Sequence, residues 1–197
     1  CIADEVQTGL GRLGSYYFGF EQQKVVPDIV VLGKPIGNGH PIGAVVTTKK
    51  IAKAFDNGIE FFSTFGGSDL SCLIANEVLE IIDDEKLGEN AQQMGLLFQE
   101  GLEELKCNFP LIGDVRGMGL FWGIEIIRGI ETREPGSSEA DYICNRLRDR
   151  GILTGLEGPF ENVLKIRPPL SLDKDDVRTF LNILTAVMEE SYLKIAN

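Results

Sequence analysis

The sequence of 197 residues lacks several features that mark common functional classes. It contains one histidine, His40, and four cysteines that lie far apart and fit no zinc-ligand spacing. No apolar run approaches the length needed to cross a bilayer. Positive charges form no long run, and the net charge of −11 makes the surface as a whole repel nucleic acid and anionic membranes. We therefore expect no metal site, no nucleic-acid partner and no membrane segment.

The cysteines and the first residues add two expectations. Cys1, Cys72, Cys107 and Cys144 indicate reduced, partly buried thiols in a reducing compartment, and we expect a cytoplasmic location. A catalytic thiol is not indicated, because nothing pairs His40 with a cysteine. The chain begins without an initiator methionine and inside a strand-like run, so we expect it to be a piece of a longer polypeptide.

The first part of the sequence, residues 1–108, is predicted to belong to an α/β sheet domain. Apolar runs at residues 29–32 and 44–47 are short and continuous, a pattern typical of strands covered on both faces in a parallel sheet. Helices are predicted over 49–57 and 69–84. Apolar residues from Leu87 to Leu105 then recur at three- and four-residue steps, which predicts a long amphipathic helix leading out of this domain.

Residues 109–197 are predicted to form a small α+β domain. Pro110 and Gly113 interrupt the helical pattern near the proposed boundary. Helical and strand-like segments then alternate with fewer buried runs, which favours this fold class. The predicted elements are strands at 120–127 and 163–166 and helices at 138–150 and 177–188.

Three segments of the first domain carry residues suited to pyridoxal phosphate. Asp4 ends a strand-like run, and its carboxylate could keep a pyridine nitrogen protonated, which makes the ring an electron sink. Lys34 ends the strand at 29–32, so we expect its amine in a crevice where partial loss of water favours the neutral form. Thr64, with Gly66 and Gly67, offers a hydroxyl and unhindered amides to a phosphate. Taken singly, these could be a turn aspartate, a solvated lysine and a turn threonine.

Two glycine motifs point elsewhere but lack the required context. Gly9-x-Gly11-x-x-Gly14 matches the dinucleotide-binding fingerprint by letter, yet the residues that follow make a poor helix start. We interpret it as a flexible turn. Gly37-x-Gly39 lacks the Gly-Lys-Ser/Thr ending of a nucleoside-triphosphate loop.

The same segments resemble a known family. Asp4-Glu5-Val6-Gln7-Thr8-Gly9, Pro27-Asp28-Ile29-Val30 through Lys34, and Pro41-x-Gly43-Ala44-Val45 resemble the signature of class-III aminotransferases. Arg116-Gly117-x-Gly119-Leu120 and Pro168-Pro169-Leu170 resemble small-domain motifs of the same enzymes. The resemblance runs the whole length but covers the second half of a usual member. It implies the C-terminal part of the fold type I pyridoxal-phosphate-transferase large domain, followed by a small α+β domain.

The resemblance implies roles for five residues of the first domain. Asp4 would pair with the pyridine nitrogen of pyridoxal 5'-phosphate, Val6 would pack under the ring, and Gln7 would lie near the ring hydroxyl. Lys34 would form the internal aldimine and serve as the general base. Thr64 would bind the cofactor phosphate of the neighbouring subunit, which implies a homodimer with a shared active site.

Lys165 stands where members that use amino acids usually place an arginine for the substrate carboxylate. Lysine is a point charge and does not replace a bidentate guanidinium well. With Gly158-Pro159 and Asn162-Val163-Leu164 before it, this stretch most resembles the ethanolamine-phosphate phospho-lyases, whose substrate has no α-carboxylate. Lys165 is thus a candidate substrate contact, and a solvent-facing lysine at a strand end is the alternative.

These observations lead to one expected function and two alternatives. We expect a class-III aminotransferase-type enzyme that transfers an amino group between an amine or amino acid and a keto acid or aldehyde. One alternative is a phospho-lyase that eliminates phosphate from phosphoethanolamine or a similar amine. The other is a non-catalytic dimerisation module, because the family's first half, with another phosphate loop and a stacking aromatic residue, is not in this chain. The isolated chain is accordingly expected to bind the cofactor poorly.

Overall fold

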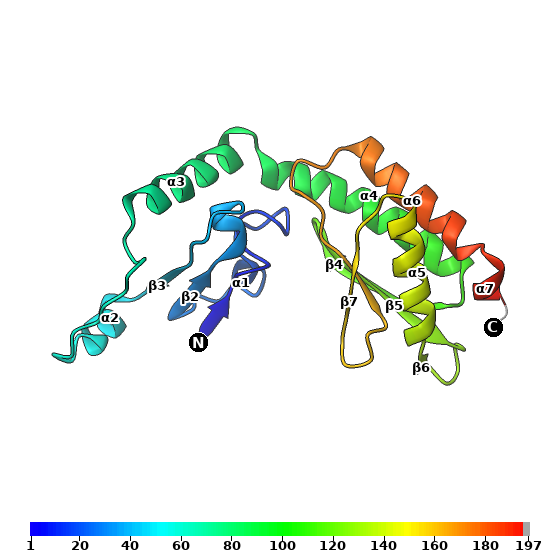
Figure 1. Ribbon diagram of the computed structural model, residues 1–197, viewed down its shortest axis with the longest axis horizontal. Coiled ribbons are helices and arrows are strands. Elements are labelled where there is room, and N and C mark those ends of the chain that lie inside the picture. The colour runs from blue at the N-terminus through cyan, green and yellow to red at the C-terminus, as the bar shows by residue number, and fades with distance from the viewer. Residues whose placement is uncertain (195–197) are drawn as a thin grey trace. The chain divides into compact units, whose positions relative to one another are not determined.

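The computed structural model describes residues 1–194 (Figure 1). The chain divides into two compact units, residues 1–89 and the residues from Asn90 onward. The predicted domain boundary at 108/109 stays a prediction. Each unit has its own sheet, and each is described by itself below.

The first unit contains a three-stranded sheet in the order β1-β2-β3. Strand β1 (Ile2–Asp4) runs parallel to β2 (Ile29–Leu32), and β3 (Ala44–Thr47) runs antiparallel to β2. A parallel sheet was predicted here, and β3 departs from it. Only residues 33–43 join β2 to β3, and a parallel crossover needs a dozen residues or more. Val45 and Val46 are 66% and 56% exposed, so β3 is not covered on both faces in this chain.

Two helices of the first unit begin at side-chain caps. The elements are α1 (Gly19–Gln22), the 3-10 helix η1 (Lys34–Gly37), α2 (Lys49–Phe55) and α3 (Asp69–Asp84). Thr48 caps α2 and Ser68 caps α3, each hydroxyl accepting a hydrogen bond from a backbone N–H of the first turn. The predicted bounds of α3 are confirmed, and α2 ends two residues before the prediction. Helix α3 lies against η1.

The second unit contains a five-stranded antiparallel sheet in the order β4-β5-β8-β7, with β6 paired to β5. The strands are β4 (Ile112–Met118), β5 (Phe121–Arg128), β6 (Glu134–Pro135), β7 (Gly155–Glu157) and β8 (Val163–Ile166). The helices are α4 (Leu87–Asn108), whose first three residues belong to the first unit, α5 (Ser137–Asp149), α6 (Lys174–Met188) and α7 (Ser191–Lys194). The sequence predicted β5, β8 and the three long helices, but not β4, β6 or β7.

One face of this second sheet is buried against the long helices. Side chains of β5 alternate between buried and half-buried along the strand, as expected for a sheet covered on one face. The predicted apolar stripe of α4 is buried, and Phe98 of α4 meets Phe180 of α6 edge to face with ring centroids 5.6 Å apart. Register pairs Trp122 with Ile166 on the buried face and Gly123 with Lys165 on the opposite face. Lys165 therefore points away from the core.

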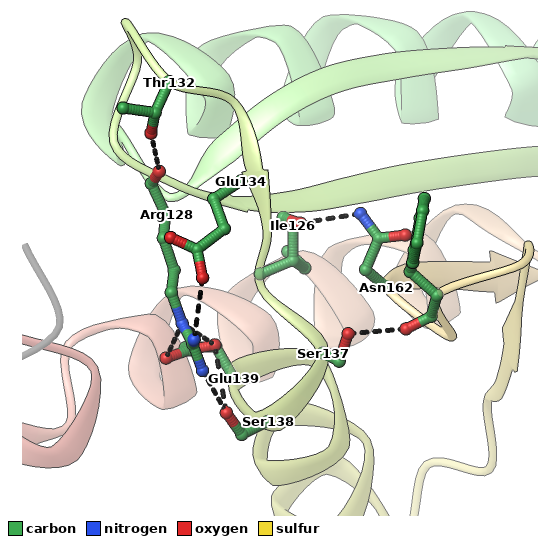
Figure 2. A network of polar contacts seen from close by, with 9 residues as sticks. Ile126, Arg128, Thr132, Glu134, Ser137, Ser138, Glu139 and Asn162 are labelled. Carbon is green, nitrogen blue, oxygen red and sulfur yellow. Dashed lines mark hydrogen bonds and ion pairs between the residues drawn. The ribbon is translucent and has the colours of Figure 1, made fainter.

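A polar network fixes the start of α5 to the end of β5 (Figure 2). Arg128 Nε donates to both carboxylate oxygens of Glu139, at 2.9 and 3.0 Å, and Glu139 is only 4% exposed. This hydrogen bond is the largest cause that raises the pKa of Arg128. Ser137 Oγ donates to the carbonyl oxygen of Phe160, and Asn162 Nδ2 donates to that of Ile126. The network thereby also anchors the residues that lead into β8.

The cysteines differ from the expectation in their burial. All four are free thiols, but Cys1, Cys72 and Cys107 are exposed and only Cys144 is half-buried. Cys72 and Cys107 lie on α3 and α4, outside the positions that those helices bury. Within residues 1–194, no helix combines the length and the apolar character that crossing a bilayer would need.

Candidate active site

Asp4 and Lys34 lie at the carboxyl ends of two neighbouring parallel strands. Asp4 is the last residue of β1, and its register partner on β2 is Val31, three residues before Lys34. Open α/β sheets bind ligands outside the carboxyl ends of their strands. The two residues that the sequence singled out for cofactor chemistry therefore belong to one edge of one sheet.

The backbone at Lys34 is held in an uncommon conformation. Lys34 opens η1 with a φ of 45°, in the left-handed region that residues other than glycine rarely adopt. Such strain costs about 1–3 kcal/mol and is concentrated at functional sites. The side chain is exposed, so the crevice expected around Lys34 is not formed by this unit alone.

Val6 forms an apolar contact between the two strand ends. A Cβ atom built on Gly33 would lie 3.6 and 3.7 Å from the two methyl carbons of Val6. Asp4 is exposed, and its Oδ1 accepts a hydrogen bond from Val6 N at 3.2 Å. Gln7 is half-buried. A carboxylate, an apolar surface and a primary amine at one sheet edge fit the chemistry of a pyridine ring that carries an aldehyde.

Glu5 is a buried carboxylate that the sequence analysis did not single out. It is 3% exposed and lies directly after β1. Its Oε2 accepts from Thr8 Oγ1 at 2.7 Å and from Gly19 N at 2.8 Å, and its Oε1 accepts from Phe20 N at 2.8 Å. Because side chains alternate along a strand, the residue directly after Asp4 is expected to point to the opposite face of the sheet from Asp4. Glu5 therefore fixes the backbone next to Asp4 to the start of α1.

The glycine motif between Glu5 and α1 is a turn, as predicted, and it opens no helix. Leu10, Gly11 and Gly14 have positive φ angles of 62°, 77° and 82°. The turn is hydrogen-bonded, because Gly11 N donates to the carbonyl of Tyr17 and Gly14 N to that of Gly11. The motif therefore does not form the helix start that dinucleotide binding requires.

Thr64 lies in an exposed turn that leads into α3. Ser63 Oγ accepts a hydrogen bond from Gly66 N at 3.1 Å, and Gly67 has a φ of 71° with open space around its α-carbon. No hydrogen bond among residues 1–194 joins Thr64 to Asp4 or Lys34. Its assignment to the cofactor phosphate stays a prediction.

Lys165 is paired with a carboxylate on the neighbouring strand. Its Nζ lies 2.5 Å from Oε1 of Glu157, and the side chains are 20% and 56% exposed. This hydrogen bond is the largest cause that lowers the pKa of Glu157. The register neighbours of Lys165 are Gly123 on β5 and Gly155 on β7, which have no side chains. Lys165 as a substrate contact stays a prediction, and so does the alternative of a strand-end lysine facing solvent.

Arg116, on the same face of the sheet, is also neutralised by resident carboxylates. It lies 3.0 Å from Asp114 and 2.7 Å from Glu125. The hydrogen bond with Glu125 is the largest cause that raises the pKa of Arg116. Cations on this face are therefore held by acidic partners that sequence spacing did not reveal.

Comparison with known proteins shows the family of this chain. The profile of the family described as aminotransferase class-III matches residues 1–188. A Drosophila melanogaster protein named alanine–glyoxylate aminotransferase 2-like is 46% identical over 196 residues, covering 96% of this chain and 40% of its own length. A Caenorhabditis elegans protein named ethanolamine-phosphate phospho-lyase homolog 1 is 40% identical over 190 residues, covering 95% of this chain and 41% of its own length.

Solved structures give the same result. A phospholyase from Arthrobacter, solved in complex with phosphoethanolamine, superposes with a TM-score of 0.91 at 40% identity. A Bacillus anthracis aminotransferase superposes with a TM-score of 0.88 at 35% identity. Each match covers 95% of this chain and 44% of the solved chain, and the fold assignment from sequence is confirmed. The chain spans about two fifths of the length of the relatives it matches, and it belongs to the class-III aminotransferase family.

Proposed function

We propose that the complete protein is a pyridoxal-phosphate-dependent enzyme of the aminotransferase type. It would transfer an amino group between an amine or amino acid and a keto acid or aldehyde. The observation that carries this proposal is the placement of the Asp4 carboxylate and the Lys34 amine at the carboxyl ends of β1 and β2, with Val6 between the two segments. Class-III aminotransferases use this cofactor.

Each residue has a defined task in this proposal. When bound, the cofactor supplies a conjugated ring that takes up the electrons released at the Cα atom of an amine substrate. Asp4 would keep a negative charge beside the ring nitrogen, Val6 would contact the flat face of the ring, and Gln7 would lie beside the ring hydroxyl. Lys34 Nζ would hold the cofactor at its aldehyde carbon, and the same amine would be the general base for the Cα proton of the substrate. The Thr64 hydroxyl would bind the cofactor phosphate of the neighbouring subunit.

The overall transfer needs no external oxidant. The donor exchanges its amino group for the carbonyl oxygen of the acceptor, so one amine becomes an aldehyde or ketone while one carbonyl compound becomes an amine. The same Lys34 and Asp4 groups serve both halves of the exchange. Members of this reaction class therefore differ mainly in the contacts that select the donor and acceptor.

A phospho-lyase is the second candidate, and Lys165 is the observation that favours it. The residue is a lysine held by Glu157, which suits a substrate without an α-carboxylate better than an amino acid. The likeness to the Arthrobacter phospholyase supports the same reading. Phosphoethanolamine and water would give acetaldehyde, ammonia and phosphate. Lys34 would remove the Cα proton, and phosphate would leave from the neighbouring carbon.

We also propose that the protein is a homodimer with a shared active site in the cytoplasm. Phe61, Phe62 and Phe65, beside Thr64, are 74%, 79% and 88% exposed. Large apolar side chains exposed together indicate a surface that a partner covers. A relative of this chain is named as mitochondrial, so fractionation of cells that express the complete protein should test the location.

Borohydride trapping tests the assignment of Lys34. The complete protein mixed with pyridoxal phosphate should absorb visible light, and borohydride should attach the cofactor to Lys34. Lys34→Ala should abolish turnover and labelling while its far-ultraviolet circular dichroism stays unchanged. Lys53→Ala, an exposed lysine of α2, is the matched control. A complete protein that stays colourless and unlabelled at Lys34 would refute the proposal.

Product analysis separates the two candidate reactions. Stoichiometric phosphate, ammonia and acetaldehyde from phosphoethanolamine without an amino acceptor would establish the phospho-lyase. Turnover that requires a keto acid or aldehyde, and releases no phosphate, would establish the aminotransferase.

A further inference from the structure

We infer that His40 is a positioning residue that links the Lys34 loop to the helix that follows the Thr64 turn. The inference rests on the proposed function, because it concerns the segments assigned there to the cofactor aldehyde of this subunit and to the cofactor phosphate of the neighbouring subunit. His40 is the only histidine in the chain. Its Nε2 lies 2.8 Å from Ser71 Oγ, and both side chains are half-buried.

The loop that carries Lys34 is closed on itself before it reaches His40. After η1, Asn38 and Gly39 adopt positive φ angles of 43° and 101°, and His40 N donates to the carbonyl of Gly37 at 2.8 Å. A Cβ atom at Gly37 would lie 2.7 Å from Ile42 Cγ2, so this position has no room for a larger residue. The imidazole therefore leaves a tight loop whose geometry is set by its own contacts.

Ser71, the partner of His40, lies just after the turn that carries Thr64. Ser68 caps α3, and Ser71 belongs to the first turn of that helix. Ser63 Oγ closes the preceding turn by accepting a hydrogen bond from Gly66 N. Only residues 65–70 separate Thr64 from Ser71, so a shift of the helix start would move the end of the Thr64 turn with it.

The His40–Ser71 hydrogen bond makes the contact between the Lys34 loop and α3 directional, because the rest of that contact is apolar. Ile36 of η1 and Ala75 of α3 are buried, at 5% and 7% exposed, and α3 lies against η1. Apolar burial is not directional, so it tolerates a small shift of the helix along the loop. A hydrogen bond at 2.8 Å does not, because it weakens steeply with misalignment.

This role predicts a specific kinetic pattern. In a dimer with a shared active site, one subunit supplies Lys34 and its neighbour supplies Thr64 to each cofactor. Loss of the bond in both subunits should therefore let these two groups shift relative to each other and weaken cofactor binding. A typical hydrogen bond corresponds to roughly a threefold to tenfold change in an equilibrium constant. We therefore expect the dissociation constant for pyridoxal phosphate to rise by about that factor. Turnover at saturating cofactor should change less than about twofold, because the reacting groups themselves are kept.

The experiment measures cofactor affinity of the complete protein by absorbance titration for His40→Leu, His40→Gln, Ser71→Ala and His40→Leu/Ser71→Ala. His40→Leu and Ser71→Ala should each weaken cofactor binding. The double variant should bind the cofactor no more weakly than the single variant with the lower affinity. His40→Gln keeps a polar end group and should recover part of the affinity. Asn76→Ala, an exposed change on the same helix, is the control. Thermal melts followed by circular dichroism should show all variants folded.

The outcomes separate this inference from the proposed function. If the unmodified protein binds cofactor through Lys34 and the His40 and Ser71 variants bind it equally well, the inference is wrong and the proposed function stands. Additive effects of the two single changes would also overturn it, because the residues would then act independently. If the unmodified protein binds no cofactor, both proposals are wrong.

Discussion

Replacement of Glu5 by glutamine should loosen the segment that carries Asp4, Val6 and Gln7. The two carboxylate oxygens of Glu5 accept three hydrogen bonds in a site that is 3% exposed. A glutamine offers one oxygen and one amide group that only donates. If the oxygen keeps the hydrogen bonds from Thr8 and Gly19, the amide group faces the N–H of Phe20. Two hydrogen-bond donors then face each other in a buried site.

The expected cost follows from these contacts. A buried donor without an acceptor costs about 1–3 kcal/mol, and a hydrogen bond to a charged group contributes about 1.5–3 kcal/mol. The contacts are coupled, so their sum is an upper bound, and we expect Glu5→Gln to lower the free energy of unfolding by about 2–4 kcal/mol. Glu21→Gln is the matched control, because Glu21 is exposed and accepts one hydrogen bond, from Phe18 N. It should cost less than about 1 kcal/mol.

Urea unfolding and limited proteolysis together test this prediction. Urea curves give the change in unfolding free energy, and protease cleavage between Glu5 and Gly19 should accelerate in Glu5→Gln under native conditions. Cofactor affinity should fall with it, because Val6 and Gln7 lie in the loosened segment. Glu5→Gln and Glu21→Gln with equal unfolding free energies would refute the assigned role of the buried carboxylate.

Two further changes probe the charges of the second unit. The pKa of Glu190 is lowered to about 2, first by its hydrogen bond with Arg146, so its pairing stabilises the fold above the unfolded pKa of about 4.3 and is lost as the pH falls toward 2. Between pH 6 and pH 3, the unfolding free energy of the unmodified chain, measured with urea, should fall by about 1 kcal/mol more than that of Glu190→Gln, allowing for solvent screening. Equal losses would contradict this. Glu157→Gln should remove the partner of Lys165 and lower the apparent KM for a carboxylate-bearing amino donor by about twofold to fivefold. The KM for a donor without a carboxylate should stay unchanged, and equal shifts for both donors would argue against Lys165 as a substrate contact.

The elements that could be predicted from the sequence are those whose signal is local. Helix α3 begins after a serine cap and its bounds were predicted, and β8 ends before the Pro168-Pro169 pair. Strand β4 was missed because Gly113 and Gly117 look like turn residues. The two glycines instead lie close to side chains of the paired strand β5, since a Cβ atom at Gly117 would lie 2.6 Å from the ring of Trp122. Only the paired strand explains a glycine there.

In the candidate site, too, local sequence signals predicted some features and not others. Asp4 and Lys34 could be placed at one sheet edge, because each follows a strand-like run and parallel neighbours end on the same side. Their exposure could not be foreseen, because burial depends on what surrounds a strand end. Partners such as Ser71 for His40 stand 31 residues away, and no periodicity marks them. Roles that depend on packing therefore had to come from the structure.

Two adjacent carboxylates at the end of β1 divide the work of the site between them. Glu5 is buried and fully committed to backbone and hydroxyl donors, so it sets where the chain runs. Asp4 is exposed, and beyond one backbone contact its carboxylate is open to a ligand. Lys34 repeats this pattern, with a strained backbone held by the η1 loop and an exposed amine. At both positions the backbone is held in place while the reactive side chain is exposed. A cofactor that binds here would therefore meet the Asp4 carboxylate and the Lys34 amine at fixed positions.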